Sequence, residues 1–523
     1  MRTTHVKLQT EGLRPTRDRL FYLIYLLALA ASVSLWFLAI RSPLWVDETY
    51  SYWQISAGFS GILARQIISF PAYSYILWFS TKFIGTSEIA LRIPSILAVL
   101  GAAYLLYLAA RELFESDIAF IAAIVFCIHR IVVFEAIDAR PYAFAILAVN
   151  AAILVMLRLR RTDSNWLAAL FGFLAACIIW FHFTFATILP ALILCFFITK
   201  FRDRKTMWRQ FGIAAAAFAL ALLPAIPRFL YVLRASGTLV YEQPPTLMNL
   251  AGTFAPGWPW VALGVIALVI LAVTALVAAV RTRSVSRIHV QGQPILLCLC
   301  LALIPILILY GVSVGTSIHT FDFRHCLDAV PGIALCWAML LGFLRPRILR
   351  LLFSVVLVAV VSYSFYNASY SRQHKYSWKH ALEVTEKNAS VDHAPVLICS
   401  DFVESSFATM PVGSAKDSNL FTPLSYYRLS APVVPLPKAL NGETVRVSSQ
   451  FLKEAASKHE RFLAFACLGS YPTIEWLAQS AAATHSVRSV GVFDGIKILE
   501  FTPRSIAPGN RPSNCLLYTS RCV

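Results

Sequence analysis

Charged side chains are scarce in this chain of 523 residues. They make up 14% of the sequence, whereas hydrophobic residues make up 58% and the mean hydropathy is +0.67. A soluble domain is usually about a quarter charged and about half apolar. A chain this apolar cannot hide its hydrophobic surface in one aqueous core, which excludes a soluble enzyme and a disordered protein. The composition predicts an α-helical multi-pass membrane protein.

Several familiar site patterns are also missing from the sequence. It has no P-loop and no Gly-x-Gly-x-x-Gly, and no Cys and His residues at zinc-finger spacing. These absences argue against a nucleotide-driven pump and a Rossmann-type nucleotide-sugar enzyme. The cysteines do not form a secreted disulfide framework either, because seven of the eleven lie in or beside apolar runs, where a thiol behaves as a small hydrophobe.

Eleven apolar runs are long enough, or nearly long enough, to cross a membrane, which takes about 20 residues. The stretch 166–199 must hold two helices, and His182 marks the turn between them; His129 and Arg130 interrupt the third run. The runs are 21–40, 93–110, 118–134, 141–157, 166–180, 184–199, 211–227, 260–280, 294–312, 326–344 and 351–366.

Lysine and arginine are unevenly distributed between the loops. With the N-terminus inside, the inside segments carry 20 of them in 65 residues and the outside loops carry 9 in 110. Positive residues accumulate in loops that stay cytoplasmic. The net charge of +18 therefore reflects membrane topology and predicts no nucleic-acid partner. We expect a protein of the cell (inner) membrane with a cytoplasmic N-terminus and an extracytoplasmic C-terminus.

The first outside loop is too aromatic to be a plain solvated loop. From Thr49 to Gly85 it predicts two interfacial helices separated by Pro71. The alternative is one extra membrane-spanning helix over residues 72–86, against which Lys82 and the short length argue.

Four parts of the chain follow from these patterns. Residues 1–20 form a cytoplasmic N-terminus, 21–368 a transmembrane catalytic domain, and 369–512 a small extracytoplasmic α/β domain. Strands are expected at 395–399 and 462–466 and helices at 378–388, 451–458 and 473–483. Cys399 and Cys467 end the two strands, and a disulfide between them stays open as an alternative. Residues 513–523 resemble a translated sequencing adapter and are set aside.

Ionisable residues collect just beyond the outer ends of the helices, where each is costly and therefore informative. The acids include Asp47, Glu48, Glu135, Asp138, Asp322 and Asp328, and the bases Arg92, Arg140 and Arg324. Arginine holds a lipid phosphate well, and a carboxylate can take the proton of an acceptor hydroxyl. The combination suits glycosyl transfer from a lipid-phosphate sugar.

Four segments resemble, in order, motifs of the GT-C superfamily of membrane glycosyltransferases, which includes protein O-mannosyltransferases and lipid A aminoarabinose transferases. The first, Trp45-Val-Asp47-Glu48-Thr49-Tyr50-Ser51, is similar to the Asp-Glu motif of the first outside loop. The others are Gly85-Thr-Ser-Glu88-Ile-Ala-Leu91-Arg92-Ile-Pro94-Ser95, Asp138-Ala-Arg140-Pro141-Tyr142-Ala143 and Phe323-Arg324-His325-Cys326-Leu327 with Pro331. The chain departs from the family where Phe70 precedes Pro71 in place of a histidine, and where Asp138 replaces a glutamate.

The resemblance implies a polyprenyl-phosphate-linked sugar donor, a glycan, lipid or protein acceptor, and an inverting displacement beside membrane lipids. Asp47, Glu48 and Asp138 are the candidate catalytic residues, and Arg140, Arg324 and Arg92 the candidate phosphate ligands. A divalent cation, Mg or Mn, is an option, with Glu48 or Asp138 as its ligand.

Each candidate also has a plain structural alternative. Asp47 could cap an interfacial helix, Asp138 and Arg140 could form a local ion pair, and Arg92 or Arg324 could reach lipid headgroups. A transporter or flippase of lipid-linked substrates, or an inactive scaffold relative, are the rival functions. Transporters, however, tend to carry mid-membrane charges and repeated halves, and this chain shows neither.

The topology generates a direct prediction. Eleven crossings from an inside start place the C-terminal domain outside, so the variant Ser418→Cys should react with a membrane-impermeant thiol reagent in intact cells. The chain without the added cysteine is the control for background. Labelling that appears only after lysis would contradict the predicted topology.

Overall fold

The computed structural model describes residues 15–65, 71–201, 203–228, 230, 244–282, 292–316, 319–344, 346–367, 378–400, 402, 408–411 and 413–504. The chain divides into two compact units, Met1–Ser377 and Trp378–Val523. The adapter-like segment 513–523 and most of the N-terminal segment 1–20 lie outside the described residues.

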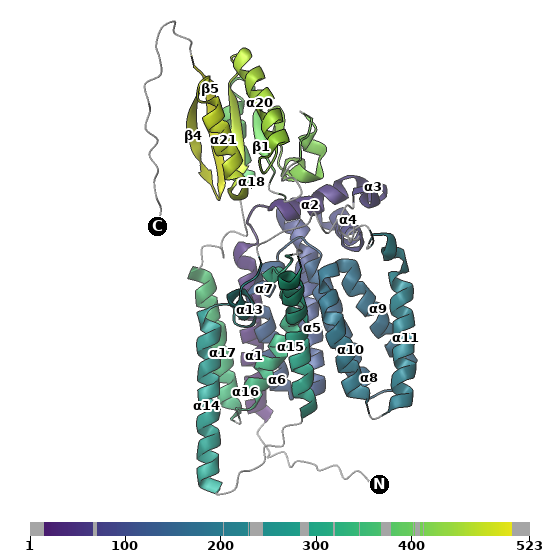
Figure 1. Ribbon diagram of the computed structural model, residues 1–523. Coiled ribbons are helices and arrows are strands. Elements are labelled where there is room, and N and C mark those ends of the chain that lie inside the picture. Colours follow the sequence, from purple (N-terminus) through teal and green to yellow (C-terminus); the bar gives the residue numbers. More distant parts are fainter. Residues whose placement is uncertain are drawn as a thin grey trace. The chain divides into compact units, whose positions relative to one another are not determined.

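The first unit is a bundle of helices (Figure 1). Its elements are α1 Pro15–Ser34, η1 Leu35–Ala39, α2 Val46–Ser56, α3 Gly58–Arg65, α4 Ala72–Ile84, α5 Glu88–Leu113, α6 Ser116–Ile128, α7 Arg130–Glu135, α8 Tyr142–Leu159, α9 Asn165–Phe181, η2 Phe183–Ile188, α10 Leu189–Lys200, α11 Arg204–Leu222, η3 Leu223–Ala225, α13 Leu247–Phe254, α14 Trp258–Thr282, α15 Gly292–Gly315, η5 Phe323–Ala329, α16 Val330–Gly342 and α17 Arg347–Asn367.

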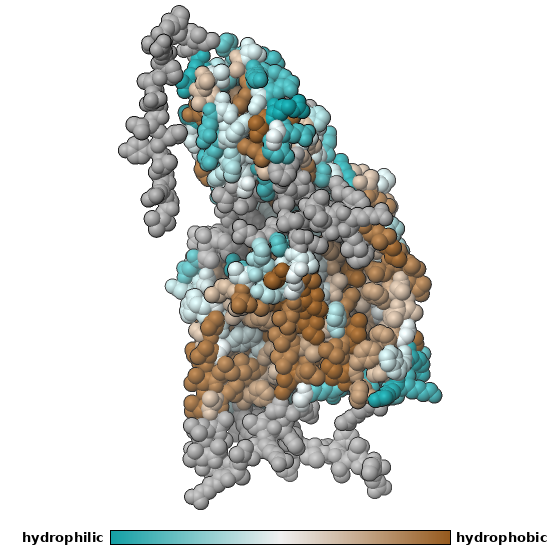
Figure 2. Space-filling model, in the orientation of Figure 1, coloured by the Kyte–Doolittle hydropathy of each residue, from teal (hydrophilic) through white to brown (hydrophobic). Residues whose placement is uncertain are grey.

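The predicted multi-pass helical fold is confirmed. Within the described residues, eight helices are long and apolar enough to cross a membrane, and a ninth span results if α13 and α14, bent by 66°, are taken together. Two shorter apolar helices, α6 and α9, account for the remaining predicted runs. Figure 2 shows the corresponding hydrophobic band across the helices of this unit. In a membrane such a band faces lipid.

Two helix breaks lie where a histidine interrupts an apolar run. His129 separates α6 from α7, and His182 ends α9 and precedes η2. A broken helix exposes backbone carbonyls, which need donors inside a membrane. The Trp36 indole supplies one of them, since its Nε1 donates to the Cys127 carbonyl at 2.9 Å.

The first loop forms three short helices, α2, α3 and α4. We expected two helices, one before and one after Pro71. Gly58, with φ +78°, lies at the joint between α2 and α3 and takes a conformation that favours glycine. The alternative of an extra span over 72–86 does not fit, because α4 has only 13 residues and a span needs about 20.

The second unit contains α18 Trp378–Ala389, β1 Val396–Cys399, η8 Ala415–Asp417, η9 Asn419–Phe421, α19 Pro423–Tyr426, β2 Val433–Leu436, α20 Gly442–Ser457, β3 Phe462–Cys467, η10 Leu468–Ser470, α21 Tyr471–Ala481, β4 His485–Phe493 and β5 Ile496–Pro503. Its sheet has the order β2-β1-β3-β5-β4. The first three strands are parallel, and β5 and β4 add an antiparallel hairpin.

Burial explains which strands the sequence revealed. Every residue of β1 and β3 is buried, as expected for strands covered on both faces. Helices α20 and α21 share one core with the sheet, and Trp378 of α18 packs on Phe465 with ring centroids 4.8 Å apart. We expected neither the hairpin nor β2, and α20 begins nine residues before the predicted 451. Cys399 is a free thiol, so the disulfide with Cys467 does not form.

Close helix packing in the bundle depends on glycine. A Cβ added to Gly332 of α16 would lie 2.3 Å from the Ala302 nitrogen and the Leu301 carbonyl carbon of α15. These are backbone atoms and cannot move aside without displacing the helix. Small residues allow such close approach between membrane helices.

We therefore expect Gly332→Ala to lower the free energy of unfolding by about 1–3 kcal/mol, the usual cost of overpacking. Gly212 of α11 is the matched control, because a Cβ there meets no atom within 4 Å. Gly212→Ala should leave stability unchanged or slightly raised, since alanine favours helix. Thermal unfolding of both purified variants tests this, and equal melting temperatures would contradict it.

Candidate active site

A fully buried ion pair holds the first loop against the bundle. Arg92, in the first turns of α5, donates Nε to Glu48 Oε1 at 2.7 Å and Nη2 to Glu48 Oε2 at 2.6 Å. Both side chains are 0% exposed. A bidentate guanidinium–carboxylate pair has the strongest geometry available to these two groups. The pair therefore fixes α2 on α5.

The remaining polar atoms of this pair are occupied by backbone groups. Arg92 also donates to the carbonyls of Ile40, Ser42 and Pro43, at 2.7, 2.7 and 3.3 Å, so all five guanidinium hydrogens are used. Glu48 accepts the backbone N–H groups of Trp45 and Ala139 at 3.3 and 3.1 Å. Neither side chain has capacity left for a ligand.

Asp47 lies beside Glu48 in sequence but faces a different environment. Consecutive residues of a helix point in different directions, and the Asp47 side chain remains 19% exposed. Its Oδ2 accepts a bond from Arg324 Nη1 at 3.2 Å, across 277 residues. The N-terminal cap of α2 is Trp45, and the carboxylate that bonds the cap nitrogen belongs to Glu48. The capping alternative thus describes Glu48 and not Asp47.

Arg324 is oriented by two carboxylates and two rings. Its Nε donates to Asp322 Oδ2 at 2.8 Å, and its guanidinium lies over the rings of Trp45 and Tyr142, 5.2 and 6.0 Å from their centroids. Burial acts to raise the pKa of Asp322, but the Arg324 charge outweighs it and holds that pKa below its usual value. These contacts fix the guanidinium. The bonds to Asp322 and Asp47 use Nε and Nη1, and neither uses Nη2.

Arg140 adds a second positive charge to the same place. It lies just before α8, donates Nη1 to the Asp47 carbonyl at 3.3 Å, and approaches the Tyr50 ring. Its Nε is buried and has no hydrogen-bond partner among the described residues. An unsatisfied buried donor on a charged group is costly. Two guanidinium groups beside one partly exposed carboxylate make a site suited to an anion.

Asp138 is close by but deeper. It is fully buried, and its Oδ1 accepts a bond from Trp45 Nε1 at 3.0 Å. Burial, together with the neighbouring Glu48 carboxylate, raises the pKa of Asp138 to about 7. This bond to the Trp45 indole spans 93 residues, a contact that the alternative of a local pair between Asp138 and Arg140 did not include. Asp138 therefore helps to position Trp45 under Arg324.

The site also includes three side chains that the sequence did not lead us to select, namely Tyr142, His182 and His325. Tyr142 stacks on His182 at 4.4 Å between centroids, and His182 lies 5.6 Å from His325. Burial, and the nearby positive groups, lower the pKa of His182 well below its usual value. Two features of the sequence could have pointed to these histidines: His325 directly follows Arg324, and His182 marks a helix turn. The contact between the two histidines arises only in the tertiary structure.

The predicted metal ligands do not fit a cation. Glu48 is saturated by Arg92 and two backbone N–H groups, and Asp138 lies beside the positive charge of Arg140. In the part of the chain that is described, no three His, Cys, Asp or Glu side chains are grouped as metal ligands.

The raised pKa of Asp138 predicts a pH dependence of stability. A carboxyl with a folded-state pKa of about 7 and an unfolded value of about 3.9 favours folding when protonated. Its contribution is complete below about pH 4 and is lost as the pH rises through about 7. Asp138→Asn should remove this decline. Melting temperatures of the two proteins between pH 4 and 8 test it, with Asp163→Asn, at an exposed aspartate, as control; parallel curves would contradict the assignment.

Comparison with known proteins gives one family match. Residues 69–231 match the family model described as dolichyl-phosphate-mannose-protein mannosyltransferase. No curated protein gives a significant match.

Solved structures extend the comparison to the whole fold. ArnT from Cupriavidus metallidurans in the apo state is similar with a TM-score of 0.55 and 12% identity, covering 93% of this chain and 98% of that one. The same ArnT bound to undecaprenyl phosphate gives a TM-score of 0.40 with the same identity and coverage. The Archaeoglobus fulgidus oligosaccharyltransferase in complex with Zn and sulfate gives 0.45 and 12% identity, covering 90% and 72%. The family match and the ArnT-like fold confirm the resemblance of this chain to the GT-C superfamily of membrane glycosyltransferases.

Proposed function

We propose that the chain is a membrane glycosyltransferase that moves a monosaccharide from a polyprenyl-phosphate donor to an acceptor hydroxyl. The matched family is described by a dolichyl-phosphate-linked mannose donor, and ArnT, whose fold is similar, has also been solved with undecaprenyl phosphate. The acceptor hydroxyl belongs to a glycan, a lipid or a protein. The reaction takes place at the outer face of the cell (inner) membrane, in line with the charge bias of the loops.

The observation that carries the proposal is the contact between Asp47 and Arg324. An inverting transfer needs a base beside the acceptor oxygen on one face of the anomeric carbon and an anion ligand beside the leaving phosphate on the opposite face. Asp47 and Arg324 come from opposite parts of the chain and meet at 3.2 Å with side chains 19% and 16% exposed. Asp322, which also contacts Arg324, is 15% exposed, whereas Glu48 and Arg92 are sealed.

Asp47 acts as the general base. The acceptor oxygen attacks the anomeric carbon while Asp47 takes its proton, and the bond from that carbon to the phosphate oxygen breaks. The leaving electron pair goes to the lipid phosphate, and the configuration at the anomeric carbon inverts in this single displacement. A positioned carboxylate contributes typically about 10²–10⁴-fold to such a proton transfer.

Arg324 and Arg140 stabilise the phosphate as it departs. The hydrogen bonds of Arg324 to Asp47 and Asp322 use its Nε and Nη1, which leaves Nη2 for a phosphate oxygen. Arg140 offers its buried Nε. Donors already fixed where charge develops cost no reorganisation during the reaction. The carboxylates of Asp47 and Asp322 keep the Arg324 guanidinium in place before donor binds, and the Asp47 carbonyl holds that of Arg140.

Glu48 and Arg92 then act through position alone. Glu48 bonds the Ala139 N–H, one residue before Arg140, and is itself one residue after Asp47. Their ion pair therefore spaces Asp47 and Arg140 without touching substrate. Asp138 has a similar role through Trp45.

Replacing Asp47 by Asn tests the base assignment. The change keeps shape and removes the basic oxygen, so turnover should fall by at least about 100-fold. Melting temperature should change little, because Glu48 and not Asp47 bonds the helix cap. Turnover is measured with the donor that a panel of labelled polyprenyl-phosphate sugars identifies. Asp163→Asn is the matched control, and near-normal turnover of Asp47→Asn would refute the mechanism.

A further inference from the structure

Two histidines in the Asp47 site each keep one ring nitrogen that the protein does not use. His182 Nδ1 lies 2.6 Å from Thr184 Oγ1, and His325 Nδ1 lies 2.7 Å from the Thr320 carbonyl oxygen. Within the described residues, neither Nε2 atom has a hydrogen-bond partner, and neither is among the fully buried polar atoms. Both Nε2 atoms are therefore available to a ligand.

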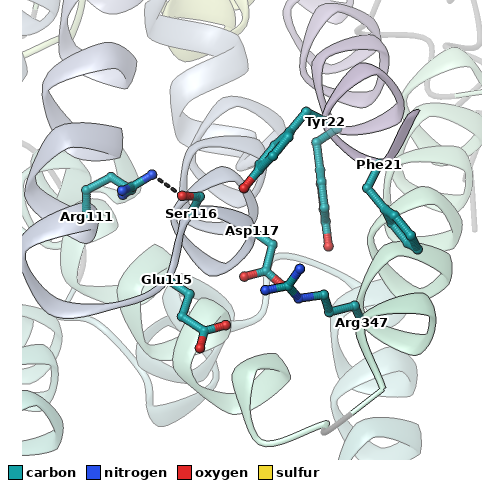
Figure 3. Close-up of a pocket in the computed structure, with 8 residues that line it drawn as sticks. Phe21, Tyr22, Arg111, Glu115, Ser116, Asp117 and Arg347 are labelled. Carbon is teal, nitrogen blue, oxygen red and sulfur yellow. Dashed lines mark hydrogen bonds between the residues drawn. The ribbon is translucent and has the colours of Figure 1, made fainter. Parts of the chain in front are cut away.

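A polar pocket at the other end of α5 differs in this respect. It has a volume of about 310 Å³, and Arg111, Glu115 and Asp117 are among the residues that line it. Figure 3 shows the bond from Arg111 to the Ser116 hydroxyl, and Asp117 pairs with Arg350 at 2.8 Å. Because charged groups of that pocket already bind other parts of the protein, the two histidines are the stronger sign of a ligand.

The partner of each Nδ1 determines where the ring hydrogens lie. A carbonyl oxygen only accepts, so His325 Nδ1 carries a hydrogen, and Nε2 of the neutral ring carries a lone pair. The Thr184 hydroxyl has no other acceptor in the described part of the chain, so it donates to His182 Nδ1. The neutral His182 ring then carries its hydrogen on Nε2. One Nε2 atom can therefore accept a hydrogen bond, and the other can donate one.

Tyr142 brings both imidazole rings close to Arg324, the proposed phosphate ligand. The Tyr142 ring centroid is 4.4 Å from that of His182 and 6.3 Å from that of His325, and the two imidazole centroids are 5.6 Å apart. The Arg324 guanidinium lies 6.0 Å from the same Tyr142 centroid. The two available nitrogens and the guanidinium therefore surround one tyrosine, as a site for a sugar and its phosphate requires.

We infer that His182 and His325 together bind one hydroxyl group of the donor sugar. This inference rests on the proposed transfer from a polyprenyl-phosphate sugar. A hydroxyl can donate to the His325 lone pair and accept from the His182 N–H at the same time, whereas a methylene does neither and an ammonium cannot accept. The hydroxyl belongs to the donor because Arg324, which holds the donor phosphate, directly precedes His325. The pair thus selects donor sugars that carry a hydroxyl at this position.

Donors that lack a single hydroxyl test the inference. The ratio kcat/KM is measured with the donor that the labelled panel identifies and with each of its monodeoxy forms. We expect the loss of one particular hydroxyl to lower kcat/KM of the unaltered protein about tenfold, the effect of a lost hydrogen bond. In His325→Asn, which keeps an amide near the Nδ1 position and lacks Nε2, that loss should have little further effect. His182→Asn should become insensitive to the same hydroxyl.

His319→Asn is the matched control. His319 Nδ1 also lies 2.7 Å from a backbone carbonyl, that of Ser313, and no ring contact joins His319 to His182 or His325 in the described residues. This variant should discriminate between the donors as the unaltered protein does. The affinity for polyprenyl phosphate without a sugar, measured by native mass spectrometry, should be equal in His325→Asn and the unaltered protein, which also shows that the variant is folded.

The possible failures can be told apart. If every monodeoxy donor loses the same factor in the unaltered protein and in both histidine variants, or if His325→Asn also binds plain polyprenyl phosphate more weakly, the inference is wrong and the transferase function stands. If the histidine variants change the KM of the acceptor and leave the response to the deoxy donors intact, the hydroxyl is not that of the donor sugar. If the unaltered protein uses no polyprenyl-phosphate sugar, the proposed function fails, and this inference fails with it.

Discussion

The ion pair between Glu48 and Arg92 is the contact on which the geometry of the site depends. Two charges with no exposure to solvent are expensive to bury, and their attraction offsets that cost only when every hydrogen-bonding atom is satisfied. Here all five guanidinium hydrogens and both carboxylate oxygens are engaged. The pair joins the loop after η1, helix α2, helix α5 and the segment before α8. Four separate parts of the chain are thereby held at one point.

The functional groups are the immediate neighbours of this buried pair. Asp47 precedes Glu48, and Arg140 follows Ala139, whose N–H is bonded by Glu48. Neighbouring side chains point in different directions. Asp47 is therefore partly exposed while Glu48, the next residue, is buried in a structural contact. A substrate can reach Asp47 and Arg324 while the groups that position them stay sealed. Rigid support of this kind holds two guanidinium groups and two carboxylates in fixed positions close together.

The two ends of the bundle use arginine in different ways. At the Asp47 end, the guanidinium groups are fixed by carboxylates and aromatic faces and keep single edges available. At the other end of α5, Arg350 lies 2.8 Å from Asp117 in a largely buried ion pair. Between them, the helices are packed through apolar side chains and glycine contacts such as Gly332 on α15. Polar chemistry is thus confined to the ends of the spans, where water and lipid headgroups are within reach.

The sequence by itself determined the membrane class, the positions of all eleven apolar runs, the breaks at His129 and His182, and the two fully buried strands. These features depend on the length and hydropathy of short segments, because a membrane span needs about 20 apolar residues and a buried strand needs a short apolar run. It did not distinguish Asp47 from Glu48, since both are acids in one motif. Only the tertiary structure decided this, because Arg92 is 44 residues from Glu48 and Ala139 is 91. Likewise β2 and the hairpin of β4 and β5 become strands because a neighbouring strand supplies their hydrogen bonds. Glu48 is buried and Asp47 is partly exposed because of the distant residues that pack against them. No local sequence pattern predicts this difference.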